Sequence, residues 1–164
     1  MPQKECDICK NVAACNGNME IKTLENTALE QLTDVFNEAF KGYEIPMHRS
    51  VDEIANKIAA ENIDLHYSVG AFDEDRLVGF ILHAIDVHNG KKIAWNGGTG
   101  VIEDHRGKRL TEKMYDFVLP MLKKNNVERI VLEVLKTNEK AKRVYVKLGF
   151  KDTRELLSYK GIMD

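Results

Sequence analysis

Cysteine is scarce in this 164-residue sequence, and its placement excludes a disulfide framework. All three cysteines, Cys6, Cys9 and Cys15, precede residue 16, so the rest of the chain has neither an internal disulfide nor a cysteine nucleophile. The Cys6 and Cys9 spacing is typical of half a zinc site, but a structural zinc needs four ligands and the next histidine is His48. We therefore expect no metal and interpret residues 1–18 as a flexible extension, with zinc binding there as the alternative.

The sequence also lacks a strong charge of either sign and any long apolar run. Its formal net charge is -2 and its pI is about 6.2, which gives no general positive field toward nucleic acid or anionic membrane. No stretch approaches the roughly 18 apolar residues of a membrane span, and the charged first twenty residues lack the apolar segment of a secretory signal. We expect a cytoplasmic monomer or homodimer that binds neither nucleic acid nor membrane.

What is present is the composition of one globular domain. Hydrophobic residues make up 43% of the chain and charged residues 30%. A chain of this length and composition can bury one proper core, whereas two full domains would be small. The sequence thus predicts a single domain over residues 19–164.

Hydrophobic periodicity and helix caps predict the elements of the first half. A capping box, in which Ser or Thr and a Glu three residues later satisfy each other's free amides, predicts each of two helix starts. In order, we expect a strand at 19–24, a helix capped by Thr27 and Glu30 and ending at Gly42, a helix capped by Ser50 and Glu53, and strands at 65–71 and 77–87. Asn89-Gly90 predicts a type I′ hairpin turn into the next strand, which ends near Val101.

The second half is predicted to alternate between helix and strand. A helical stripe begins at Leu110 and contains Pro120, which predicts a kink or an early end. We then expect a strand at 129–135, a helix at 138–148 with Gly149 as its C′ cap, and a weak strand at 153–160. The order β-α-α-β-β-β-α-β-α-β predicts an α/β fold of the α+β type, with a mixed, mostly antiparallel central sheet flanked by helices.

The turn between Val101 and the next helix has features of an anion site. A helix that starts after a strand presents unpaired amides, and these together with its dipole favour a phosphate. Lys108, Arg109 and Lys113 add positive charge around it. The alternative interpretation is an ordinary loop with a solvated basic patch.

A second segment, residues 132–150, carries a more specific pattern. It contains Leu132-Glu133-Val134, then Asn138 and Ala141, then Tyr145 and Gly149-Phe150. This pattern resembles the strand and helix that close the cofactor site in the GNAT superfamily of acyl-CoA N-acyltransferases. The preceding turn is similar to the same family's V-x-P-x-x-R-G-x-G-x-G/A through Val101, Arg106 and Gly107, and the resemblance is best over residues 93–160.

Three residues of the turn depart from the family pattern. Glu103 replaces the usual Pro, Arg109 the second Gly, and Thr111 the last Gly or Ala. Glycines there let the backbone approach a pyrophosphate closely. Arg109 offers a compensating charge to a phosphate oxygen. A non-catalytic acyl-CoA-binding module of the same fold therefore stays open as an alternative.

The resemblance implies a GNAT-like fold and an acetyl-CoA-dependent N-acetyltransferase, without metal, acting on a primary amine of a small molecule or peptide by direct attack in a ternary complex. It implies a cofactor site at Thr99, Gly100, Val101, Arg106, Gly107, Lys108, Arg109, Leu110, Thr111, Glu112 and Asn138. It places an acceptor site at Tyr43, Glu44, Met47, Trp95 and Asn96.

Two catalytic residues are also implied by the resemblance. Tyr145 would protonate the departing CoA thiolate, and Glu133 would act as the base. An alkyl amine has a pKa of about 10, so roughly one molecule in a thousand is nucleophilic at neutral pH and a base is needed. The alternatives are a core aromatic for Tyr145 and a solvated strand residue for Glu133.

Overall fold

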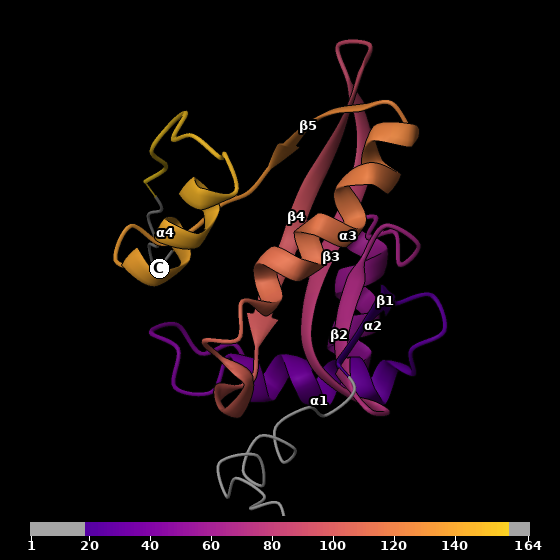
Figure 1. Cartoon of the computed structure of the whole chain (residues 1–164), viewed down its shortest axis with the longest axis vertical. Coiled ribbons are helices and arrows are strands. Elements are labelled where there is room, and N and C mark those ends of the chain that lie inside the picture. Colours follow the sequence, from indigo (N-terminus) through magenta and orange to yellow (C-terminus); the bar gives the residue numbers. More distant parts are fainter. Residues whose placement is uncertain (1–18, 158–164) are drawn as a thin grey trace, which may run out of the picture. The chain divides into compact units, whose positions relative to one another are not determined.

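The computed structural model describes residues 19–157 and divides the chain into two compact units (Figure 1). The first unit ends at Glu133 and contains the sheet, and the second begins at Val134. The predicted cysteine-containing extension at 1–18 lies outside the described residues. The single domain expected over 19–164 remains a prediction.

The elements follow the predicted order up to the last helix. They are β1 (Met19–Thr23), α1 (Leu29–Ala39), α2 (Val51–Ala60), β2 (Val69–Asp73), β3 (Arg76–His88), β4 (Lys91–Val101), the short 3-10 helix η2 (Glu103–His105), α3 (Leu110–Lys124), β5 (Val127–Val131) and α4 (Glu139–Lys147). The described residues therefore contain five strands, one fewer than predicted. Residues 153–157 form no strand, and residues 158–160 of that predicted strand lie outside the described range.

The five strands form one sheet in the order β1-β2-β3-β4-β5. Neighbours pair antiparallel from β1 to β4, and β4 pairs parallel with β5 through α3 as the crossover (Figure 1). The predicted mixed, mostly antiparallel sheet is confirmed.

Adjacent residues of β3 show that helices cover both faces of the sheet. The Phe80 ring stacks on Phe36 of α1 at 5.7 Å between centroids. A Cβ at the preceding residue, Gly79, would instead lie 3.6 Å from Met114 of α3. Because successive strand residues point to opposite faces, α1 and α3 cover opposite sides. This explains why β3 is buried from Leu77 to Ala84 rather than at alternate residues.

Local turn and cap chemistry accounts for one helix start but not the other. The Ser50 and Glu53 capping box is present in full. The Thr27 and Glu30 box is wrong: α1 has Ala28 as its N-cap, without a capping bond from that residue's side chain in the described structure. Thr27 lies one residue too early to cap, and its amide donates to the carbonyl of Leu24 instead.

The start of β2 is also later than predicted, because Asp64 organises a turn first. The Asp64 carbonyl accepts from the Tyr67 amide at 3.1 Å and from the Ser68 hydroxyl at 2.8 Å. The strand itself is buried from Val69 to Phe72, so it does not show the expected alternation. The Asn89-Gly90 turn is confirmed, with φ of 52° and 74°.

Pro120 does not end its helix, since α3 continues to Lys124. The proline is exposed, so water can solvate the carbonyl that it leaves without a partner. Val118 and Leu122, on either side of it, are buried and keep the helix on the sheet. The next strand, β5, begins earlier and ends earlier than the predicted range of 129–135.

In the second unit, α4 matches the predicted helix closely. Asn138 is its N-cap and accepts from the Ala141 amide at 3.1 Å. Leu148 is its C-cap, and Gly149 follows with φ +91°, the left-handed conformation expected of a C′ glycine.

Candidate functional site

The outer part of β4 has an edge that β5 does not cover. Parallel pairing joins Lys92 to Val127 at one end and Trp95 to Val131 at the other. From Asn96 to Val101, β4 has no β5 partner among residues 19–157. This open edge contains Thr99, Gly100 and Val101, the three strand residues predicted to contact the cofactor.

A bulge starts this open edge. Gly98 lies opposite Leu82 and Asn96 lies opposite His83, which leaves Gly97 as the extra residue. The Asn96 side chain accepts from the Gly98 amide at 2.9 Å and donates to the Thr99 hydroxyl at 2.8 Å and to the Tyr115 hydroxyl at 2.8 Å. Asn96, expected in an acceptor site, therefore fixes the backbone of the bulge.

The turn after β4 is fastened by Arg106. Its Nε donates to the Val101 carbonyl at 3.0 Å and its Nη2 to the Ala39 carbonyl at 2.9 Å. Hydrogen bonds from a charged donor are stronger than neutral ones. Arg106 thus holds the turn against both β4 and α1.

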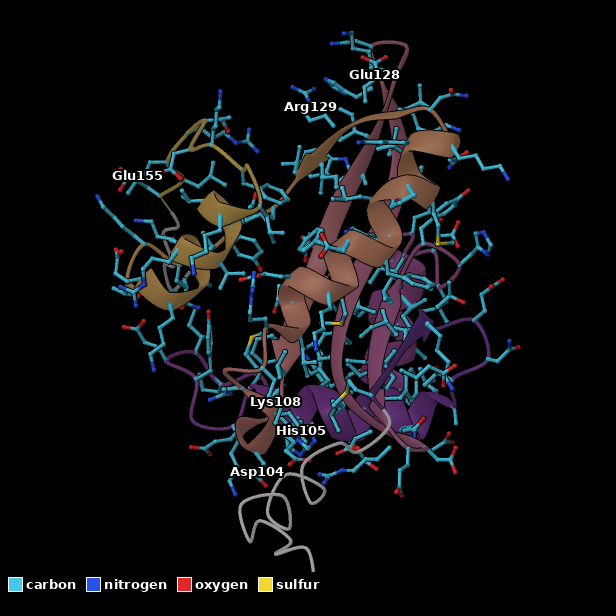
Figure 2. All side chains as sticks on the ribbon, in the orientation of Figure 1. Asp104, His105, Lys108, Glu128, Arg129 and Glu155 are labelled. Atoms are coloured by element: carbon cyan, nitrogen blue, oxygen red, sulfur yellow. The ribbon has the colours of Figure 1, made fainter. Side chains whose placement is uncertain are left out.

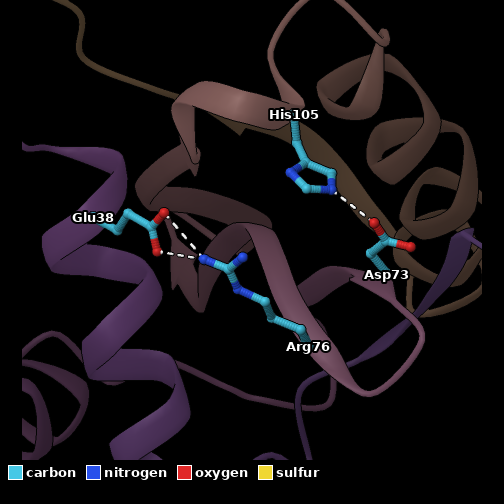
Figure 3. Close-up of polar contacts among 4 residues, drawn as sticks. All are labelled: Glu38, Asp73, Arg76 and His105. Atoms are coloured by element: carbon cyan, nitrogen blue, oxygen red, sulfur yellow. Dashed lines mark hydrogen bonds and ion pairs between the residues drawn. The ribbon is translucent and has the colours of Figure 1, made fainter. Parts of the chain in front are cut away.

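A buried histidine provides a second fastening of the same turn (Figure 3). His105 Nε2 lies 2.8 Å from Asp73 Oδ2, which joins η2 to the end of β2. In the same view Arg76 pairs with Glu38 and so joins β3 to α1. The His105–Asp73 hydrogen bond and the Arg76–Glu38 ion pair both restrain the region from which the turn emerges.

Two residues of the turn adopt left-handed backbone conformations, with φ +77° at Gly107 and +59° at Arg109. For a residue with a Cβ this conformation costs about 1–2 kcal/mol, whereas glycine adopts it freely. Arg109 therefore keeps a conformation that favours glycine. Its guanidinium Nε donates to Glu112 Oε2 at 2.6 Å, and this hydrogen bond, together with the Glu112 charge, raises the pKa of Arg109.

The first turn of α3 offers unpaired amides. Buried Leu110 anchors the helix start. The first hydrogen bond of the α-helical pattern runs from the Lys113 amide to the Arg109 carbonyl at 3.1 Å. The amides of residues 110–112 precede it, and the described Arg109 side chain makes no capping bond. Figure 2 shows Lys108 together with Asp104 and His105 at this turn. Free amides and a cation suit an anion.

A cavity of about 180 Å³ lies on the α1 face of the same strand. Its lining consists of Phe36, Phe40, Met47, Arg49, Lys57, Glu61, Gly97 and Gly98. Met47 is the acceptor-site residue that lines it, and the Tyr43 ring packs on Phe40 at 5.4 Å. Glu44, Trp95 and Asn96 are not among the lining residues. From the sequence we did not predict Arg49, Lys57 and Glu61 as site residues. The available signal was the pair of consecutive glycines within a strand, since such glycines are typical of a bulge or a close approach by another group.

The two predicted catalytic residues belong to different units, Glu133 to the first and Tyr145 to the second. Glu133 is exposed and follows the end of β5 by two residues. Tyr145 is half-buried on α4, and its ring lies 5.6 Å from that of Phe150.

The core under α3 contains a neutral histidine. His83 Nδ1 lies 2.8 Å from the Tyr67 carbonyl, which can only accept, so this nitrogen carries the hydrogen. Burial lowers the pKa of His83 to about 4. Its Nε2 has no hydrogen-bond partner in the described part of the chain, and its ring lies 6.0 Å from that of Tyr115. Burial keeps this group uncharged at neutral pH.

Comparison with known families identifies the class of protein. A family model described as "Acetyltransferase (GNAT) family" matches residues 29–150, which is more than half of the chain. The chain therefore belongs to the GNAT acetyltransferase family. Within residues 19–157, no helix is long and apolar enough to cross a membrane, and no three His, Cys, Asp or Glu side chains gather as metal ligands would.

Individual relatives agree with this assignment. N-alpha-acetyltransferase 30 of Schizosaccharomyces pombe is 30% identical over 94 residues, which are 57% of this chain and 63% of that protein. The chain is also similar to the NatC complex bound to Gag peptide and CoA (TM-score 0.69, 18% identity, 83% of this chain and 86% of that one). AAC(6')-Iy in complex with the bisubstrate analogue CoA-S-monomethyl-acetylneamine gives a TM-score of 0.66 at 18% identity, with 88% and 99% covered. At these identities the solved structures show the fold alone.

Proposed function

We propose that this chain is an acetyl-CoA-dependent N-acetyltransferase that acts on a primary amine of a small molecule or peptide. The observation that carries the proposal is the open edge of β4 from Asn96 to Val101, followed by the uncapped start of α3. An unpaired strand edge suits the amide groups of a pantetheine arm, and free helix amides suit a pyrophosphate.

The residues of the turn fit such a ligand. Apart from its own two chain neighbours, no described residue has an atom within 4 Å of a Cβ built on Gly107, so the backbone there is open to a phosphate. The amides of Leu110, Thr111 and Glu112 would donate to it, and Lys108 and Arg109 would add positive charge. In this proposal Arg106 holds the turn in place through the Val101 and Ala39 carbonyls. Asn138, by the family resemblance, would contact the arm.

The chemistry requires proton transfers at both ends of the reaction. Bound acetyl-CoA supplies the acetyl group as a thioester. The acceptor ammonium first gives one proton to solvent, and the neutral nitrogen then forms a bond to the acetyl carbon and loses a second proton, for which we propose Glu133 as the base. The C–S bond breaks, and the sulfur leaves as thiolate, to which Tyr145 gives a proton. Donation from a phenol to a thiolate is uphill by roughly 2 kcal/mol at ordinary pKa values, so nearby positive charge is needed.

The acceptor end is supported by a relative and by the cavity. The name N-alpha-acetyltransferase describes transfer to an α-amine in that protein, and the cavity beside Gly97 and Gly98 adjoins the open edge of β4. Met47 lines it, while Tyr43 supports its Phe40 wall.

The test is thiol release from acetyl-CoA across a panel of amines, amino-acid amides and short peptides. We expect stoichiometric acetylation of an amine, detected by intact mass, and the loss of thiol release in Tyr145→Phe. If no acceptor increases thiol release above the hydrolysis rate, the catalytic proposal fails.

A second candidate is a non-catalytic acyl-CoA-binding module of the same fold. Arg109 favours it, because a charged residue in a left-handed conformation replaces a glycine of the family turn. This candidate predicts a CoA-dependent rise in melting temperature without turnover of any amine.

A further inference from the structure

The cavity beside the β4 bulge combines an apolar floor with a charged rim. The rings of Phe36 and Phe40 and the side chain of Met47 supply apolar surface, and Arg49, Lys57 and Glu61 supply charge. All of these residues come from α1, from the connection between α1 and α2, or from α2 and the residue after it. Gly97 and Gly98 of the β4 bulge complete the lining.

Glu61 lies directly against the bulge. A Cβ added to Gly97 would lie 3.1 Å from Glu61 Oε2, closer than an ordinary contact. Gly97 therefore lets this carboxylate approach the strand backbone. Lys57 holds the carboxylate in place, with Nζ at 2.6 Å from both oxygens. The side chain of Glu61 is still 46% exposed, so it has room for a further donor.

Arg49 also lines the cavity, and its backbone is held by α1. Asn37 of α1 accepts from the Arg49 amide and donates to the Arg49 carbonyl, each at 2.8 Å. The next residue, Ser50, is the N-cap of α2. The backbone that carries this guanidinium is thus held before any ligand arrives.

We propose that this cavity binds the acceptor of the proposed acetyl transfer as a primary monoamine with a compact apolar group, and that Glu61 binds its ammonium. The inference rests on the proposed function and concerns binding, before any proton is removed. Glu61 is the one carboxylate in the described lining and lies beside the open edge of β4. A carboxylate is the natural partner of an ammonium group.

Size and charge decide the class of acceptor. The cavity of about 180 Å³ is smaller than the roughly 300–1,000 Å³ of sites for drug-sized ligands, so it suits a group near the size of one side chain. The lining contains two cations, Arg49 and Lys57, and one anion, Glu61. Once Glu61 binds the first ammonium, the described lining offers no other carboxylate, so a second ammonium on the acceptor would meet only the cations and be repelled. Polyamines and amino sugars with several amines should be poor substrates.

The experiment compares norleucinamide with lysinamide, whose side chains have the same unbranched carbon chain without and with a terminal ammonium. In the wild-type protein with saturating acetyl-CoA, we expect kcat/KM to be several-fold higher for norleucinamide. Glu61→Gln should raise KM for norleucinamide about tenfold with little change in kcat, as expected when one charge-assisted bond is lost. Arg49→Gln should reduce the preference for norleucinamide over lysinamide.

Two further variants complete the design. Gly97→Ala should raise KM in the same direction as Glu61→Gln but by less, because the new Cβ makes the Glu61 carboxylate shift by only a few tenths of an ångström. Asp52→Asn, which changes an exposed carboxylate on α2 outside the cavity, is the matched control and should behave as wild type. An unchanged KM in Glu61→Gln, or an equal preference for both amides in wild type, would overturn the inference while the proposed function stands.

Binding is also measured without turnover, from the amide chemical shifts of Gly97 and Gly98 as norleucinamide is added. Shifts in the wild type that are lost in Glu61→Gln would support the inference even if no acetylation occurs, in which case the proposed function alone fails. If these two amides do not respond to norleucinamide, the inference is wrong.

Discussion

The starts of α3 and α4 differ in a way that relates to function. At α4, the Asn138 side chain caps the helix by accepting from the Ala141 amide at 3.1 Å. At α3, the N-cap position holds Arg109 in a left-handed conformation, and its described side chain makes no capping bond. The start of α4 has satisfied one of its free amides with a side chain, whereas the start of α3 has no side-chain cap from its described N-cap residue.

The two helices also differ in what they bury. Leu110, Met114, Tyr115, Val118 and Leu122 are buried on α3, while no side chain of α4, among the residues described, is fully buried. Yet α4 is the helix whose sequence matches the family pattern at each diagnostic position. A strong motif therefore does not identify the better-packed element, and the poorer motif has left-handed backbone at both Gly107 and Arg109.

The largest expected effect is on catalysis at α4. We expect Tyr145→Phe to lower kcat by roughly 100-fold or more with little change in KM for acetyl-CoA, because loss of a general acid typically costs about 10² to 10⁴. Steady-state thiol release measures both constants. Tyr67→Phe, which removes a tyrosine hydroxyl elsewhere, should behave as wild type. Equal kcat values for the two variants would remove Tyr145 from the mechanism.

The second effect tests the core that α3 covers. The pKa of His83 is lowered from 6.5 to about 4 by burial, so the unfolded chain binds more protons than the folded one between these values. Stability is then fully present above pH 6.5 and is lost as the pH falls toward 4. The loss is about 3 kcal/mol between pH 7 and pH 4.

Urea unfolding of the wild type and His83→Gln at both pH values measures this contribution. The variant should lose less stability than the wild type over the same range, whatever its stability at pH 7. His88→Gln, which changes an exposed histidine of β3, serves as the control and should follow the wild type. An identical pH dependence for all three proteins would contradict a neutral buried His83.

The third effect separates strain from ligand contact at the start of α3. Gly107→Val should lower the free energy of unfolding by about 1–2 kcal/mol, because valine must adopt φ +77°. It should also weaken CoA binding by about tenfold, measured by calorimetry, because the side chain blocks the open backbone. Gly90→Val places the same strain, at φ +74°, in the hairpin turn. It should reproduce the loss of stability and leave CoA affinity unchanged.

The fourth effect concerns the cap itself. Asn138→Ala should destabilise α4 by about 1 kcal/mol, since it removes the side chain that accepts from Ala141. Amide hydrogen exchange in residues 139–147 measures this directly. Asn138→Ser, which retains a capping oxygen, should restore most of the protection. If the exchange rates in α4 do not change when the cap is removed, the Asn138 cap does not stabilise α4 and the two helix starts do not differ in this respect.

The smallest effect comes from Arg109. Arg109→Gly relieves the left-handed backbone and loses only an exposed ion pair with Glu112. We expect a gain in stability of up to about 1 kcal/mol, read from urea unfolding. Arg109→Lys keeps both a Cβ and a charge and should not be more stable than the wild type. A destabilised Arg109→Gly would mean that the pair with Glu112 outweighs the strain.

Much of the fold is predictable because its determinants are local. The Asn89-Gly90 turn, the Ser50 cap and the Asn138 cap each depend on residues within four positions of one another. The failures have identifiable causes. The Asp64 turn delays β2, and burial on both faces removes the alternation expected of that strand. The packing of Val118 and Leu122 carries α3 past Pro120.

The candidate site is predictable in part. The turn from Arg106 to Glu112 lies between a strand and a helix as expected. The hydrogen bonds from Arg106 to the Val101 carbonyl and from the Gly98 amide to Asn96 were not expected. The cavity was missed except for Met47. Its charged residues lie on α2 and beside it, in a pattern that on sequence alone describes a solvated helix face.

The sequence by itself determined the family, the order of the elements up to the last helix and the Asn89-Gly90 turn, because hydrophobic period, caps and positive-φ residues act over a few positions. Tertiary structure decided which groups meet. Arg106 reaches a carbonyl 67 residues earlier, and Glu61 meets a bulge glycine 36 residues later. Such contacts depend on how the helices pack across a twisted sheet, and no local pattern encodes that geometry.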